Sequence, residues 1–335
     1  MLESIASPQL WAVLVSGVVL LLALDFLLTR RPHEVRMREA VAWSAFYVAL
    51  PLAFGVYVWS AWGAQRGLEY YTGYLVEKSL SIDNLFVFIL ILGAFAVPRE
   101  LQQRVLLYGI VGALVLRTIF IVLGAAALAT FTWVFLVFGL VLALTGVKLL
   151  RDALRGKDHV IDVNSLRAVR LLRRFRPVTS DYVGTRLSVQ RNGVRMLTPL
   201  ALVMAAILAT DIVFAVDSVP AVYGITEDPF LVFATNAFAL LGLRALYFVL
   251  EGALSRLVHL GYGLAAILVF IGIKLGLHWA HGVWTWVPEI PTLVSLLVVV
   301  GVLAATTVSS ILVGRRSDVL EEPVARDEEP VGVGR

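Results

Sequence analysis

Five side chains with oxygen atoms interrupt two long apolar stretches of this chain, and their types and spacing suggest chemistry. In chain order they are Glu77, Asp83, Asn84, Asp211 and Asp217. An ionised side chain at the centre of a membrane span costs roughly 2.5–3.5 kcal/mol, so residues of this kind usually have a function. Carboxylate and amide oxygens suit hard cations such as magnesium, calcium and manganese. We therefore expect a site for a divalent cation, carried as substrate, with no permanently bound cofactor.

Further polar side chains in the apolar stretches are expected to support this site by charge or hydrogen bonding. They are Lys78, Arg117, Ser218, Asn236 and Arg244. The four acids and the two arginines together leave a charge of −2, which one divalent cation would balance. An alternative is that the charged groups form buried ion pairs that only hold helices together.

The stretches that carry these residues are expected to span a membrane. Of the 335 residues, 59% are hydrophobic and 16% are charged, and the mean hydropathy is +0.87, whereas about a quarter of the residues in soluble domains are charged. The chain has no cysteine, which excludes disulfides and thiolate metal sites. A span needs roughly 20 apolar residues, and we predict an all-α, polytopic transmembrane helix bundle of about nine spans. They are 9–29, 40–62, 70–97, 105–129, 131–150, 197–223, 231–250, 258–277 and 289–313.

Basic residues indicate the orientation of this bundle. The longest connection, 151–196, holds eleven lysines and arginines, whereas 63–69 and 224–230 carry little positive charge. By the positive-inside rule the amino terminus lies outside and the carboxyl terminus in the cytoplasm. The net charge of +4 therefore reports orientation, and we expect the lipid bilayer and no nucleic acid as partner. The loop 151–196 has an alternative role as a docking surface for anionic lipid or a partner protein.

Two parts of the chain resemble each other. Residues 81–86 match 209–214, 116–123 match 243–250, and 146–149 match 272–275, at offsets of 128, 127 and 126. Each unit has three spans, so the copies cross the membrane in opposite directions, as in many secondary transporters. The expected divisions are two N-terminal spans (1–62), a first repeat (63–150), a basic cytoplasmic loop (151–196), a second, inverted three-helix repeat (197–277), a last span (278–313) and a disordered cytoplasmic tail (314–335).

The inverted orientation also predicts the depth of the acids. Glu77 and Asp217 each lie six residues, or about 9 Å along a helix, from Asp83 and Asp211 respectively, and on the outer side of them. We expect two tiers, with Asp83 beside Asp211 at the midplane and Glu77 beside Asp217 above them. On regular helices the two acids of one span would lie roughly 120° apart in azimuth.

Three runs of residues resemble the TerC family of integral membrane proteins over roughly residues 40–313. They are Glu77-Lys78-Ser79-Leu80-Ser81-Ile82-Asp83-Asn84, the run from Thr210 to Ala221, and the run from Asn236 to Tyr247. The resemblance implies a multi-pass protein of the bacterial inner membrane, linked by the family name to tellurium resistance and, in several members, to manganese export. The acids that it assigns to the motif are Glu77, Asp83, Asp211 and Asp217, with Asn84 beside them.

The leading hypothesis is a secondary transporter that exports a divalent cation, with manganese(II) favoured, in exchange for protons that the same carboxylates can carry. One alternative is a non-transporting membrane partner in stress resistance or in metal loading of secreted proteins, and another is a calcium/proton exchanger. The sequence contains no phosphate-binding glycine loop and no HExxH, so we expect no enzyme activity. His278 and His281 are expected to belong to an interfacial segment rather than to a metal site.

Overall fold

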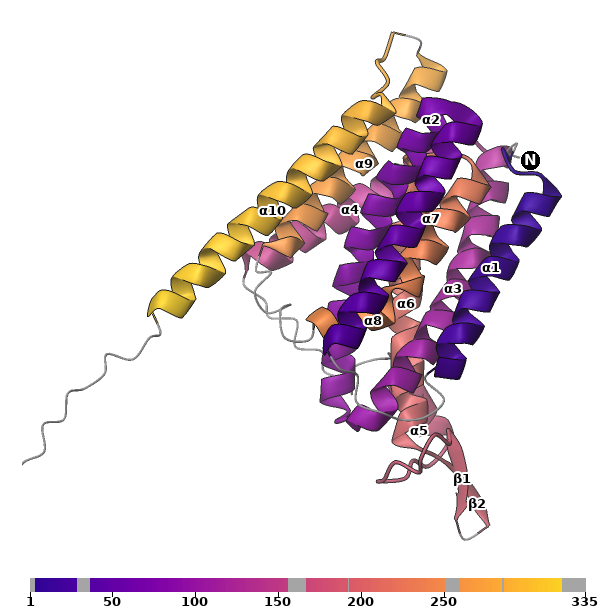
Figure 1. Cartoon of the computed structure of the whole chain (residues 1–335), viewed down its shortest axis with the longest axis vertical. Helices are drawn as coiled ribbons and strands as arrows, with labels where there is room; N and C mark the ends of the chain where they lie inside the picture. Colours follow the sequence, from indigo (N-terminus) through magenta and orange to yellow (C-terminus); the bar gives the residue numbers. More distant parts are fainter. Residues whose placement is uncertain are drawn as a thin grey trace, which may run out of the picture.

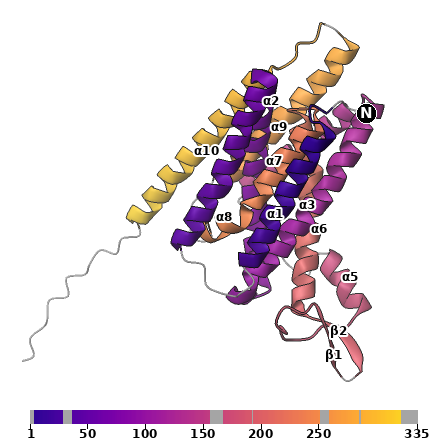
Figure 2. The ribbon, with the colours of Figure 1, turned by 45° about the vertical axis from the view of Figure 1, so that its right-hand side comes forward.

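A computed structural model describes residues 4–28, 37–155, 167–191, 193–250, 259–284 and 286–320. Helices dominate it and run side by side as a bundle (Figures 1 and 2). The predicted all-α, polytopic bundle is therefore confirmed. In chain order the elements are α1 (Pro8–Leu28), α2 (Met37–Ala94), α3 (Arg99–Thr130), α4 (Val134–Leu154), α5 (Arg167–Phe175), β1 (Ser188–Arg191), β2 (Val194–Leu197), α6 (Pro199–Tyr223), α7 (Pro229–Leu241), α8 (Leu243–Leu250), α9 (Leu260–Val283) and α10 (Thr292–Leu320).

Helix α2 supplies two of the predicted spans. As one straight helix its 58 residues would be about 87 Å long, far more than a bilayer needs. Gly63 interrupts it with a φ of 86°, a left-handed conformation that glycine adopts without steric cost. The halves before and after Gly63 lie against each other, and the Tyr70 hydroxyl donates to the Pro51 carbonyl over 3.0 Å between them. Within the described residues, eight segments are long and apolar enough to cross a membrane, and α2 is one of them.

The predicted span 231–250 lies at the centre of the bundle but is not one continuous helix. Of its most apolar window 83% is buried, against 17% for α1 and for α10, which lie at the periphery (Figure 1). The span is divided at Gly242 into α7 and α8. Here the Lys78 ammonium donates to the Ala239 carbonyl over 3.3 Å, and a cation is favourable at the carboxyl end of a helix. Lys78 therefore stabilises the break.

Helices α4 and α9 approach closely at two glycines. A Cβ atom added to Gly139 would lie 2.7 Å from the Gly272 carbonyl oxygen, and one on Gly272 would lie 2.7 Å from the Gly139 oxygen. A Cβ atom on Gly146 would lie 2.9 Å from the Ala265 oxygen. Gly146 and Gly272 are positions that the predicted repeat equates; the inverted repeat itself stays a prediction.

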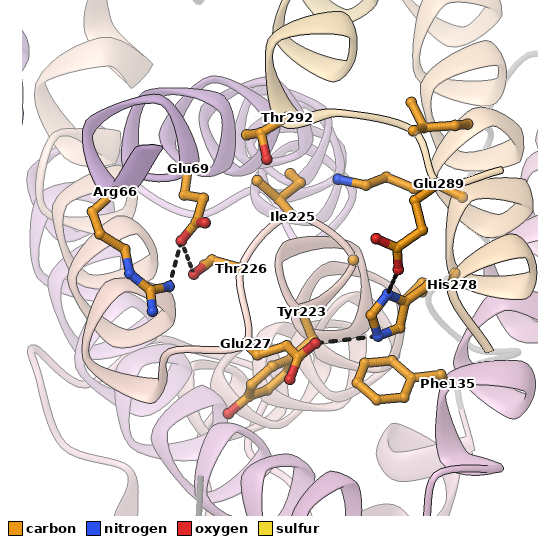
Figure 3. A pocket seen from close by; sticks show the side chains of 14 residues that line it. Arg66, Glu69, Phe135, Tyr223, Ile225, Thr226, Glu227, His278, Glu289 and Thr292 are labelled. Atoms are coloured by element: carbon orange, nitrogen blue, oxygen red, sulfur yellow. Dashed lines mark hydrogen bonds and ion pairs between the residues drawn. The ribbon is translucent and has the colours of Figure 1, made fainter. Parts of the chain in front are cut away.

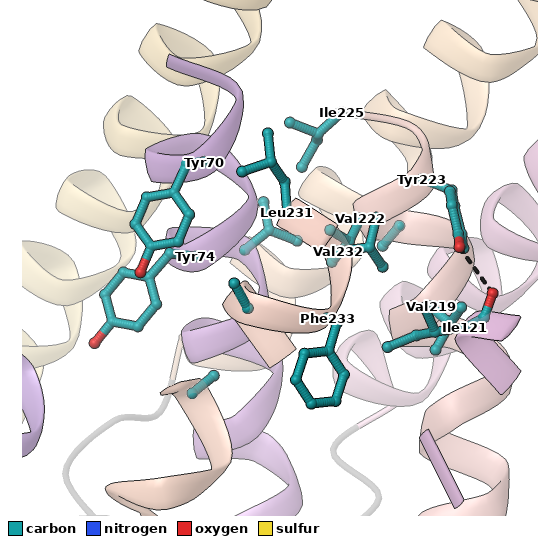
Figure 4. Close-up of a cluster of buried hydrophobic side chains, with 14 of the residues drawn as sticks. Tyr70, Tyr74, Ile121, Val219, Val222, Tyr223, Ile225, Leu231, Val232 and Phe233 are labelled. Atoms are coloured by element: carbon teal, nitrogen blue, oxygen red, sulfur yellow. Dashed lines mark hydrogen bonds between the residues drawn. The ribbon is translucent and has the colours of Figure 1, made fainter. Parts of the chain in front are cut away.

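An apolar core connects the turn between α6 and α7 with the neighbouring helices. Figure 4 shows Val222, Leu231 and Val232 inside this cluster, with Tyr70 and Tyr74 of α2 on one side. The Tyr223 hydroxyl reaches α3 and donates to the Ile121 carbonyl over 2.8 Å. A second apolar cluster, which includes Leu85 and Val203, joins α2, α3 and α6. These clusters hold α2, α3, α6 and α7 around one buried region.

The connection 151–196 contains more regular structure than a plain loop. Helix α5 and the antiparallel strands β1 and β2 project beyond one end of the bundle, and the N-terminus lies at the other end (Figures 1 and 2). The Tyr182 hydroxyl donates to the Phe95 carbonyl over 2.8 Å, which ties the connection to the end of α2. Residues 156–166 and 192 lie outside the described residues.

The last helix extends beyond residue 314, where we predicted a disordered tail to begin. Helix α10 continues to Leu320, because after Gly314 no residue that breaks a helix occurs before Pro323. The rest of the predicted tail, residues 321–335, lies outside the described residues.

Candidate functional site: a buried charge cluster

The Arg117 side chain of α3 stands at the centre of a buried charge cluster. Both it and Glu77 of α2 are fully buried, and they form a close ion pair. Arg117 Nη1 also donates to Asn236 Oδ1 of α7 over 2.9 Å. Asn236 Nδ2 in turn contacts Glu77 Oε2 over 3.3 Å. The three side chains therefore form a closed ring of polar contacts inside the bundle.

Asn84 adds a fourth member to this cluster from α2. In the amide orientation that satisfies both of its polar groups, Asn84 Oδ1 accepts from Arg117 Nη2 over 2.7 Å and Nδ2 donates to the Leu80 carbonyl over 3.0 Å. Asn84 lies seven residues after Glu77, which is about two helical turns, so both face the same neighbour. The guanidinium thus has one carboxylate and two amide oxygens around it.

Asp211 of α6 lies on the other side of Arg117. Its Oδ1 atom is 3.8 Å from Arg117 Nε, and the side chain is fully buried. Among the described residues, neither of its carboxylate oxygens accepts a hydrogen bond, and Arg117 Nε has no acceptor either. Buried polar groups normally have hydrogen-bond partners, because an unpaired buried charge is costly. Asp211 is therefore chemically suited to hold a cation or a proton.

Asp217 does not join this cluster. It is half-buried and accepts a hydrogen bond from Thr145 Oγ1 of α4 over 2.9 Å. Helix α6 runs without interruption from Pro199 to Tyr223. A step of six residues on a regular helix leaves Asp211 and Asp217 about 120° apart around its axis, so they face different neighbours. The expected tier of Glu77 with Asp217 is thus not seen; instead, Arg117 brings Glu77 and Asp211 together.

The remaining predicted ligands and supporting residues are less concentrated than we expected. Asp83 is half-buried on α2, and Ser218 is buried with a hydroxyl that has no hydrogen-bond partner among the described residues. Within the described part of the chain, no three histidine, aspartate or glutamate side chains are grouped closely enough to hold a metal ion. The predicted set of Glu77, Asp83, Asp211 and Asp217 is therefore not a preformed coordination shell.

The two arginines that the repeat equates have different partners. Arg117 contacts the predicted acids, whereas Arg244 of α8 forms a close, buried ion pair with Asp25 of α1. We did not predict Asp25 as part of any site, although an acid inside the predicted span 9–29 is the same signal that identified the others. The pair attaches the peripheral helix α1 to α8.

A separate polar pocket of about 330 Å³ opens where α6, α9 and α10 meet, near Glu69 and Thr292. Figure 3 shows His278 between two carboxylates, with Nε2 3.2 Å from Glu227 and Nδ1 2.9 Å from Glu289. The hydrogen bond with His278 lowers the pKa of Glu227 below its ordinary value. His278 thus links Glu227 with Glu289 in this pocket. Sequence reasoning had assigned His278 only to an interfacial segment.

The pocket lies at the end of the bundle that carries the N-terminus. Asp228 directly follows Glu227, which lines the pocket. The backbone N–H of Ile5, near the N-terminus, donates to the Asp228 carboxylate over 2.6 Å. Asp228 also caps α7, because it accepts from the Phe230 N–H over 2.8 Å. By the predicted orientation this is the outer end.

Comparison with known proteins supports a family assignment. The sequence profile described as "Integral membrane protein TerC family" matches residues 62–318. An uncharacterized membrane protein of Myxococcus xanthus is 42% identical over 315 residues, which are 94% of this chain and 95% of that protein. The Escherichia coli protein named "Putative membrane-bound redox modulator Alx" is 40% identical over 328 residues, 95% of this chain and 98% of that protein.

A further relative is an uncharacterized membrane protein of Mycobacterium tuberculosis, 46% identical over 278 residues, which are 82% of this chain and 70% of that protein. No solved structure matches the chain. The profile covers most of the chain, including every member of the cluster around Arg117. The chain therefore belongs to the TerC family of integral membrane proteins.

Proposed function

We propose that this chain is a secondary transporter that exports a divalent metal cation, with manganese(II) as the favoured substrate, from the cytoplasm of a bacterium across its inner membrane. The observation that carries the proposal is Asp211, a fully buried acid whose two oxygens accept no hydrogen bond from any described residue. A second fully buried acid, Glu77, lies across Arg117 from it. Residues of this kind inside a membrane typically mark an ion pathway.

The chemistry of the neighbouring groups fits a hard cation. Glu77 and Asp211 both offer carboxylate oxygens, and manganese, calcium and magnesium prefer such donors. The helix break at Gly242, six residues after Asn236 on the buried helix α7, supports transport, because discontinuous helices line the substrate sites of many transporters. Proton exchange through the same carboxylates is the coupling that we propose.

Flux measurements on purified protein in liposomes test this proposal. Wild-type protein is expected to move manganese(II), and Asp211→Asn and Glu77→Gln are expected to lower the rate about tenfold or more, because a lost charged contact is worth roughly 1.5–3 kcal/mol. Calcium and magnesium in competition identify the preferred ion. If calcium displaced manganese and drove proton movement, the chain would be a calcium/proton exchanger instead.

The matched control is Asp25→Asn. It removes the charge of another buried acid in a span, but Asp25 pairs with Arg244 outside the cluster. Per folded protein, we expect its flux to stay close to that of the wild type. Absence of flux for all three metals in the wild type, or equal losses in Asp25→Asn and Asp211→Asn, would count against transport through this site.

A second candidate function is a non-transporting membrane partner that docks through the basic connection. Helix α5 favours this alternative, because Leu171 and Phe175 are exposed on it by 56% and 73% beside several arginines. The name of the Escherichia coli relative suggests a redox role, but this chain has no cysteine, so such a role would not use thiols of its own. Resistance to metal or tellurite would then depend on residues 167–175 and not on Asp211.

A further inference from the structure

Arg117 is held in a way that suits a movable counter-charge rather than a simple ion pair. Its guanidinium contacts the Glu77 carboxylate and the amide oxygens of Asn236 and Asn84, while Nε faces Asp211 over 3.8 Å without a hydrogen bond. Arginine stays charged at every pH that proteins tolerate. This positive charge therefore cannot be removed by losing a proton, and it can change its effect only by changing its position.

The same two acids are central to the proposed transport site. A divalent cation bound by oxygens lies about 2.0–2.6 Å from each of them. A cation placed on both Glu77 and Asp211 would therefore come next to the guanidinium that now lies between these acids. Because like charges repel strongly in a medium of low dielectric constant, Arg117 and the substrate cannot occupy the acids together.

We propose that Arg117 is a built-in counter-cation that takes the place of the substrate on Glu77 and Asp211 whenever the metal leaves. This inference rests on the proposed transport function and names what neutralises the two acids while they carry neither metal nor proton. Without a cation, two buried carboxylates would oppose any conformational change that keeps them inside the membrane. With Arg117 on them, the protein can reorient without substrate.

The two asparagines give the guanidinium a position to retain while the acids bind metal. Their amide oxygens are neutral acceptors on α2 and α7, so they bind Arg117 without competing for the substrate's charge. Neither amide oxygen belongs to the two acids, so Arg117 keeps two hydrogen-bond acceptors when the metal takes Glu77 and Asp211.

Comparing net transport with exchange tests the proposal. In liposomes, net uptake of radioactive manganese(II) requires the protein to return without metal, whereas exchange against internal unlabelled manganese(II) does not. We expect Arg117→Gln to lower net uptake at least about tenfold more than it lowers exchange, since a buried charge is then left uncompensated during the return without metal. Retained exchange also shows that the variant is folded.

Two further variants separate charge from structure. Arg117→Lys keeps the positive charge and is expected to restore most of the ratio of net uptake to exchange. Arg244→Gln removes another buried arginine, which pairs with Asp25, and should leave that ratio unchanged even if less protein folds.

Several outcomes would overturn the inference. Equal losses of net uptake and exchange in Arg117→Gln, or no loss of either, would show that Arg117 does not serve the return step. Wild-type protein that exchanged manganese(II) but performed no net uptake would also overturn the inference, because no return step without metal would then exist. Wild-type protein with neither activity would instead remove the proposed transport function, and the inference with it.

Discussion

Replacing Gly272 by alanine should destabilise the protein, although alanine is the better helix former. Gly272 lies in α9 against α4, and an added Cβ atom would stand 2.7 Å from the Gly139 carbonyl oxygen and 2.9 Å from the Ala143 backbone nitrogen. Both atoms belong to the backbone of the neighbouring helix, so no side chain can rotate away. The two helices would have to move apart.

The expected magnitude follows from two opposing effects. Forcing an extra methyl group into a packed contact costs about 1–3 kcal/mol, while alanine in place of glycine in a helix gains about 0.5–1 kcal/mol. The loss of apolar contact along the separated helices adds to the first effect. We therefore expect a net loss of about 1–2 kcal/mol, or a fall of several degrees in the melting temperature.

The control is Gly276→Ala, one helical turn along the same helix. A Cβ atom at Gly276 would have no neighbour within 4 Å, so this variant should be as stable as the wild type or more stable. Thermal unfolding of both variants, purified in the same detergent, measures the difference. A Gly272→Ala protein as stable as Gly276→Ala would refute the packing argument.

Other consequences concern charges away from the cluster. Asp25→Asn leaves Arg244 as an uncompensated buried charge and should destabilise the protein by about 3 kcal/mol, and adding Arg244→Gln should recover part of the melting temperature; no recovery would show that the pair is not the cause. Lys78→Met should cost about 1–2 kcal/mol, because a carbonyl at the end of α7 loses its donor. The lowered pKa of Glu227 contributes stability that is complete above its ordinary value of 4.5 and is lost as the pH falls through the lowered value. In His278→Gln this acid-dependent loss should be smaller when melting temperature is followed between about pH 6 and 3.5, and an unchanged profile would contradict the assignment.

Sequence reasoning identified the two acids that contact Arg117 but not how they are combined. Glu77 and Asp211 were both expected at the site, and both are fully buried there. Asp217 does not join Glu77 at Arg117, because the direction in which an acid points depends on the helix that it meets, and Asp217 meets Thr145. Asp25 was missed, although its position within an apolar span could have revealed it.

The apolar segments, and which of them carry charged residues, could be predicted from the sequence alone, because a run of about 20 apolar residues is a local property and a charge stands out against it. Tertiary structure decided the partners. The placement of Arg117 between Glu77 and Asp211, and of Arg244 on Asp25, depends on the rotation of each helix about its axis and on its neighbours. Those are set by packing between residues far apart in the chain, such as Gly139 against Gly272, which no local pattern reports.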